Sequence, residues 1–186
     1  MNTLDAATTH GLSTRWADVG RPVSRRAVIV AHLIPFTVLP SGIWRTVLGF
    51  GVTLGLSRAS LEADHLPGRG TVMVVSLTLL TEALALLSLG LVRPWGEVVP
   101  QWVPGLRGRR IPPALAVVPA TVGGVILTLM WVYAVSGILP IEGLHRSEEI
   151  SGAGWSALLI ACYTPALLWG PLLLWLTRDY YRRRRG

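Results

Sequence analysis

A single carboxylate in the middle of a long apolar stretch is the residue best suited to chemistry in this chain. Glu82 lies in the sequence SLTLLTEAL, residues 76–84, near the centre of a stretch long enough to cross a membrane. An unpartnered carboxylate at that depth costs at least a few kcal/mol, so Glu82 should face protein or water. We therefore expect an acid–base or proton-coupling role. The alternative is a hydrogen-bonded residue that fixes helix packing.

Three other polar residues occur at depths from which they could act with Glu82. Arg45 lies toward the outer end of the first apolar stretch, and an ion pair with Glu82 would lower the cost of burying both charges. His32 lies near the inner end of that stretch and Tyr163 near the middle of the fourth, where either would assist proton transfer. The candidate catalytic set is therefore Glu82, His32, Tyr163 and Arg45. The alternatives are that Arg45 extends toward the membrane surface and that His32 is a packing residue.

Acidic residues and histidines also occur in two polar segments between the apolar stretches. Carboxylates and imidazoles are ligands for divalent metals, but these residues have neither HExxH spacing nor an equivalent motif. They are Glu62, Asp64 and His65 in one segment, and Glu142, His145, Glu148 and Glu149 in the other. The sequence also contains no P-loop and no GxSxG motif, and its one cysteine, Cys162, lies in an apolar stretch. We expect no metal and no cofactor.

Positioning the candidate residues requires four membrane-spanning helices. A hydrocarbon core of roughly 30 Å takes about 20 helical residues, and the predicted spans are 27–44, 71–92, 113–139 and 155–177. The composition agrees: 51% of residues are hydrophobic, mean hydropathy is +0.51 and only 15% are charged, against about 25% in a soluble domain. The fold class is therefore an all-α polytopic membrane protein. The outer end of the first span stays open, because the helix could continue past Arg45 through Val47 to Leu56.

Small residues and prolines predict how the spans pack. Gly51 and Gly55 form a GxxxG motif, and Gly123-Gly124 gives the third span a thin face, as in closely packed membrane helices. Pro165 and Pro171 remove backbone donors from the fourth span, which predicts kinks that shape a cavity or bend the helix around its neighbours.

The distribution of arginine predicts the orientation of the chain. The formal net charge is +7, and all 17 basic residues are arginine. With the N-terminus inside, thirteen arginines fall on the inner side and four on the outer side, which predicts that both termini are cytoplasmic. Residues 1–26 are then a flexible cytoplasmic tail, 27–177 the transmembrane domain, and 178–186 a basic cytoplasmic tail at the anionic inner leaflet. The arginines lie at the ends of apolar runs rather than along a folded polar face, so we expect no nucleic acid partner.

Three segments resemble a group of small, uncharacterised four-span membrane proteins of high-GC bacteria. They are Leu39–Arg45 (LPSGIWR), Leu89–Pro100 (LGLVRPWGEVVP) and Ala161–Pro171 (ACYTPALLWGP). Gln101 departs from the arginine expected at that position. The resemblance implies a multi-pass protein of the bacterial inner membrane, and it implies no residue roles because that group has no assigned activity.

Three functions fit these observations. The first is an accessory or regulatory subunit that associates with itself or with another membrane protein. The second is a membrane-embedded enzyme that acts on an isoprenoid or lipid, with Glu82 as its acid–base group. The third is a small proton-coupled transporter in which Glu82 exchanges a proton for a cationic substrate. A lipid-facing cleft beside Glu82 would favour the enzyme.

Overall fold

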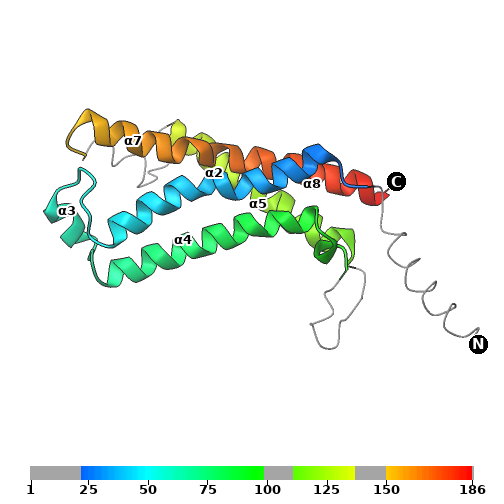
Figure 1. Ribbon diagram of the computed structural model, residues 1–186, viewed down its shortest axis with the longest axis horizontal. Helices are drawn as coiled ribbons and strands as arrows, with labels where there is room; N and C mark the ends of the chain where they lie inside the picture. Colours follow the sequence, from blue (N-terminus) through cyan, green and yellow to red (C-terminus); the bar gives the residue numbers. More distant parts are fainter. Residues whose placement is uncertain (1–21, 99–110, 137–149, 186) are drawn as a thin grey trace, which may run out of the picture.

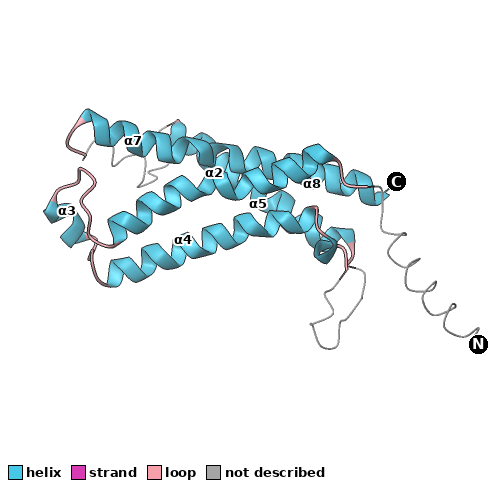
Figure 2. Ribbon diagram, in the orientation of Figure 1, coloured by secondary structure: helices cyan, strands magenta, loops and turns pink. Residues whose placement is uncertain are grey.

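The computed structural model describes residues 22–98, 111–136 and 150–185. The described chain is helical, without β-strands, and contains four helices that are long and apolar enough to cross a membrane (Figures 1 and 2). The first is α2 (Arg25–Gly49). The second is α4 (Arg69–Leu87), continued by the 3-10 turn η1 (Ser88–Leu91), and the third is α5 (Pro113–Val135). The fourth consists of α7 (Ala153–Tyr163), η3 (Thr164–Leu168) and α8 (Trp169–Arg185). Two short elements, α3 (Arg58–Ala63) and η2 (Pro94–Gly96), lie between them.

Helix α2 is central in the bundle. It packs against α4 on one side and against α7, η3 and α8 on the other, and α5 packs mainly on α8. The start of α2 and the end of α8 lie at the same end of the bundle, which we call the arginine end, and α3 lies at the opposite end (Figure 1). Four apolar helices with this arrangement suggest a multi-pass membrane protein.

The first helix is longer than the predicted span. Ser24 caps its N-terminus by accepting a hydrogen bond from the Ala27 amide at 3.2 Å. The helix then runs without interruption past Pro35, Pro40 and Arg45 to Gly49. The predicted end at Trp44 was therefore about a turn too early. The alternative, a helix that continues past Arg45 and Val47, is therefore correct up to Gly49. It does not reach Leu56, because residues 50–57 form turns and loop in which Gly51 and Gly55 have positive φ.

The predicted interruption of the fourth span occurs at Pro165. The backbone between Tyr163 and Trp169 is a 3-10 segment with this proline in its first turn, because proline cannot donate the next α-helical hydrogen bond. Helix α8 then continues to Arg185, so the basic segment 178–185 is helical in the structure.

Much of the apolar surface of α4 and α5 faces away from the protein. Met73, Val72 and Leu115 are each about two-thirds exposed or more, at 74%, 68% and 67%. Apolar surface of this extent is unusual on a soluble protein and is what a hydrocarbon environment accommodates. The interior is divided into two groups of buried residues, one around Trp44 and Tyr163 and one around Trp169 and Tyr180.

Candidate functional site

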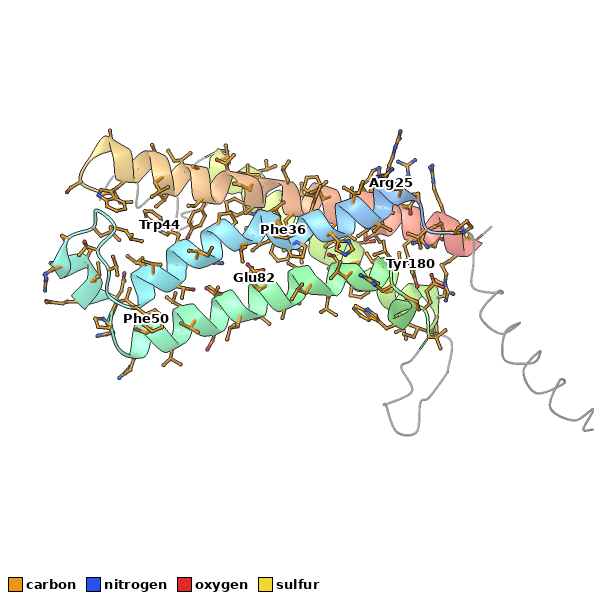
Figure 3. The ribbon with its side chains drawn as sticks, viewed as in Figure 1. Arg25, Phe36, Trp44, Phe50, Glu82 and Tyr180 are labelled. Atoms are coloured by element: carbon orange, nitrogen blue, oxygen red, sulfur yellow. The ribbon has the colours of Figure 1, made fainter. Side chains whose placement is uncertain are left out.

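Glu82 lies at the contact between α4 and α2 (Figure 3). Its carboxylate fits against α2 because residue 42 is glycine: a Cβ there would lie 3.3 Å from Glu82 Oε1 and 3.1 Å from Thr78 Cγ2. Thr78 is one turn before Glu82 on the same face of α4. Gly42 therefore makes the room in which the carboxylate sits.

Arg45 is the residue for which the sequence predicted an ion pair with Glu82. It is one turn beyond Gly42 on α2, close enough to the carboxylate for an electrostatic attraction. The pair is not a close salt bridge: Glu82 Oε1 and Arg45 Nε and Nη2 are buried and have no hydrogen-bond partner in the described part of the chain. The hydroxyl of Thr78 is likewise buried without a partner. The cluster thus holds unused donors and acceptors at a helix–helix contact.

His32 and Tyr163, the other two predicted site residues, are engaged elsewhere. The Nδ1 atom of His32 lies 2.7 Å from the Val28 carbonyl of its own helix. Ten residues of α2 separate it from Gly42, or about 15 Å at 1.5 Å per residue. Tyr163 is 6% exposed and packs edge-on against Trp131 of α5, with ring centroids 6.4 Å apart. Of the predicted set, Arg45 and Glu82 are the two for which the described contacts indicate an interaction.

The large cavity of the structure lies on a different face of α4. It has a volume of about 550 Å³ and an almost entirely apolar lining, contributed by α4, η1, η2, α5 and α8. On α4 it is lined by Leu84 and Leu87, whereas Thr78, Glu82 and the fully buried Ala85 lie on the side that packs on α2. Neither Glu82 nor Arg45 contributes to its wall. An apolar cleft therefore exists, but it does not lie beside Glu82, where the enzyme hypothesis required it.

A polar network at the arginine end was not predicted. Arg183 is 9% exposed and donates hydrogen bonds to Asp179 Oδ2 at 3.0 Å and to the Leu91 carbonyl at 2.7 Å, with Nη1 3.8 Å from Glu97 Oε1. Arg184 donates to the Ile111 carbonyl at 2.8 Å and lies 3.7 Å from Glu97 Oε2. The buried carboxylate of Glu97 thus sits between two guanidinium groups.

Tyr180 extends this network. Its side chain is fully buried beneath both guanidinium groups, and its hydroxyl donates to the Gly96 carbonyl at 3.3 Å. These contacts connect α8 with η1, η2 and the start of α5. The sequence signal was the single acid Glu97 in a segment otherwise rich in arginine, proline and glycine.

The polar segments considered for metal binding do not form a metal site in the described residues. No group of three or more His, Cys, Asp or Glu side chains converges in the ranges that the structure describes. Glu62 and His65 line a shallow hollow beside Arg69. Glu142, His145, Glu148 and Glu149 lie outside the described residues.

Comparisons with protein-family models, with curated proteins and with solved structures found no match to this chain. The resemblance to small four-span membrane proteins of high-GC bacteria therefore stays a prediction. The function of this chain has to be argued from its own geometry.

Proposed function

We propose that this chain is a multi-pass protein of the bacterial cytoplasmic membrane and acts as a non-catalytic accessory or regulatory subunit. The observation that carries the proposal is the position of Glu82. Its carboxylate is held at the α2–α4 contact by Gly42 and opposed by Arg45, while the large cavity opens on another face of α4. A reaction or transport site needs its acid–base group beside the space that receives the substrate. In this chain Glu82 and Arg45 lie at the contact between two helices, where a role in helix packing would place them.

The proposed orientation places the arginine end in the cytoplasm. Positively charged residues are retained on the cytoplasmic side of membrane proteins. At the arginine end the described residues comprise eight arginines and two acids; toward the α3 end they comprise three arginines, including Arg45, and two acids. The arginine-end residues are Arg25, Arg26, Arg93, Arg178, Arg182, Arg183, Arg184 and Arg185, with Glu97 and Asp179.

Cysteine labelling tests this orientation. Ala59 in α3 and Arg185 at the end of α8 are both exposed, and Cys162 is the only native cysteine. In a Cys162→Ser background we expect Ala59→Cys to react with a membrane-impermeant maleimide in intact cells. Arg185→Cys should react only after the membrane is permeabilised. The reverse pattern would contradict the proposed orientation, and labelling of both positions in intact cells would contradict insertion.

The structural role of Glu82 predicts a specific pattern of stability changes. Glu82→Gln removes the carboxylate that faces the Arg45 guanidinium at the α2–α4 contact, and we expect a loss of about 1–3 kcal/mol, the usual cost of leaving a buried charged group without its partner. Arg45→Gln should have a similar cost. The double variant should lose less than the sum of the two, because no lone charge remains. Thermal unfolding in detergent, followed by tryptophan fluorescence, measures all three.

Additive losses in this cycle would mean that Arg45 and Glu82 do not depend on each other. A Glu82→Gln variant with unchanged melting temperature that nevertheless abolishes a cellular phenotype would indicate chemistry or proton coupling, and would overturn the proposed function.

Native mass spectrometry of the gently extracted protein tests the accessory role itself. A subunit should be recovered in a complex of defined stoichiometry, either with further copies of this chain or with another membrane protein. A chain that is monomeric under all mild extraction conditions would contradict that role.

A further inference from the structure

The large cavity is an elongated apolar cleft that runs along α5. Its volume of about 550 Å³ lies within the range of roughly 300–1,000 Å³ that is usual for ligand sites. Its lining extends on α5 from Leu115 to Leu127, which is about 18 Å of helix at 1.5 Å per residue. One leaflet of a hydrocarbon core is about 15 Å thick. The cleft therefore has the length of one lipid chain in one leaflet.

One end of the cleft opens at the arginine end of the bundle. Trp95 and Ile111 line it there, and the Trp95 ring packs so closely on Gly90 that a Cβ at residue 90 would lie 2.7 Å from it. Trp95 is also 42% exposed, as is usual for an indole at the level of lipid headgroups. The apolar cleft thus ends where the membrane surface is expected.

Arginines outnumber acids at this end of the cleft, where Glu97 lies between Arg183 and Arg184 and Arg93 lies nearby in the sequence. Arg184 is bonded to the carbonyl of Ile111, a lining residue, and its Nε is buried with no hydrogen-bond partner in the described part of the chain. Arg93 directly precedes η2 and has an exposed side chain. An anionic headgroup would complement these charges, and phosphate oxygens are good acceptors for guanidinium donors.

We propose that this cleft binds an anionic phospholipid of the cytoplasmic leaflet, with one acyl chain along α5 and its phosphate beside Arg93 and Arg184. The inference rests on the membrane placement proposed above. It goes beyond the accessory role, because it assigns a ligand to a site that contains none of the residues predicted for chemistry.

Gly123 allows the cleft to be filled without disturbing the fold. It lines the cavity, and a Cβ added to it would meet nothing within 4 Å. A Gly123→Leu side chain should therefore occupy the space assigned to the acyl chain. Gly154 in α7 also has open space around it and is not part of the cleft wall, so Gly154→Leu is the matched control.

The experiment is native mass spectrometry of the intact protein after delipidation in detergent and titration with phosphatidylglycerol or phosphatidylcholine of the same chain lengths. The wild type and Gly154→Leu should retain one phosphatidylglycerol at collision energies that strip phosphatidylcholine. Gly123→Leu should bind it at least tenfold more weakly. Arg93→Gln should reduce the preference for phosphatidylglycerol over phosphatidylcholine, while the acyl chain should still bind in the cleft.

Three results would overturn the inference. If Gly123→Leu and the wild type retain phosphatidylglycerol equally, the lipid binds elsewhere. If the wild type retains phosphatidylglycerol and phosphatidylcholine equally, the site does not select an anionic headgroup. The third result is that the purified wild type carries a neutral amphiphile, which is lost in Gly123→Leu. The buried indole N–H of Trp169, which lines the cleft and lacks an acceptor in the described residues, would then be expected to bind an oxygen of that molecule.

Membrane fractionation of the same variants separates this inference from the proposed function. A protein that is found in the membrane fraction but carries no lipid in the mass spectrometry experiment would contradict the lipid site alone. A protein absent from the membrane fraction would contradict both the lipid site and the proposed function.

Discussion

Gly170→Ala should destabilise the protein by about 3 kcal/mol, the upper part of the range for overpacking a closely packed interior. Gly170 lies where α8 crosses α5. A Cβ on it would be 2.4 Å from Thr128 Oγ1, 2.7 Å from the Thr128 amide nitrogen and 2.9 Å from the Gly124 carbonyl oxygen. Two of these atoms belong to the backbone of α5, so relief requires the helices to move apart. In a chain of this length the loss corresponds to about 6–12 °C in melting temperature.

The matched control for this prediction is Gly123→Ala. Gly123 adjoins Gly124 on the same helix but has nothing within 4 Å of its added Cβ. Because alanine also favours a helix over glycine, we expect Gly123→Ala to be neutral or slightly stabilising. Both variants are compared by thermal unfolding in the same detergent. Equal melting temperatures for the two would show that the α5–α8 contact is looser than the structure indicates.

The four long apolar helices could be predicted from the sequence because their length and apolar composition are local properties. Their ends were less accurate. A charged residue inside a helix does not end it when the backbone hydrogen bonds continue, so α2 passes Arg45 and ends only before Gly51, where φ is +87°. For the same reason α8 extends through its terminal arginines.

Which glycines mediate helix packing could not be predicted from their spacing alone. The GxxxG pair Gly51 and Gly55 lies in the turns after α2, outside any helix, so it does not bring two helices together. These two glycines pack instead against Pro67 and against Ile150 and Trp155. The glycines that do permit close approach include Gly42, against α4, and Gly124 and Gly170, at the α5–α8 crossing. They belong to different helices, so their pairing depends on the tertiary arrangement, which a spacing motif within one helix does not contain.

The residues proposed for the candidate site stay a prediction, but their positions can be compared with the argument that selected them. Arg45 and Glu82 were chosen because a buried charge needs a partner. That argument holds whenever the two residues lie at a similar depth on neighbouring helices. His32 and Tyr163 were chosen for depth and chemical type alone. His32 proved to be too far along α2, and Tyr163 packs against Trp131 on a different helix. Depth in a membrane can be estimated from a sequence, whereas the direction in which a residue faces depends on which helices are neighbours.

The basic C-terminal segment shows the same distinction. Its arginines were predicted to form a cytoplasmic tail at the anionic leaflet, which stays a prediction. In the structure Arg182 and Arg185 are exposed. Arg183, between them, is buried by contacts with residues far away in the sequence, including Leu91 and Glu97. Consecutive arginines thus have different environments because successive residues of a helix point about 100° apart.

Arg183→Gln should cost about 3 kcal/mol, at the lower end of the range for breaking a buried ion pair. Glutamine removes the charge that Glu97 and Asp179 face and the donor to the Leu91 carbonyl. Arg184 still lies 3.7 Å from Glu97, which keeps the loss from being larger. Because the network joins α8 to η1 and η2, the α8–η1 region should also open more readily. Thermal unfolding measures the first effect, and amide hydrogen exchange at residues 88–98 measures the second.

Arg182→Gln makes the same chemical change at the neighbouring, exposed position and should stay within about 0.5 kcal/mol of the wild type, as surface substitutions usually do. The comparison separates loss of the buried network from loss of one positive charge near the membrane. If both variants fall equally in stability, the arginines act through their summed charge at the anionic leaflet, and the contacts of Arg183 are incidental. If only Arg183→Gln falls and exchange at residues 88–98 rises with it, Glu97 and Arg183 hold the arginine end of the cleft in place.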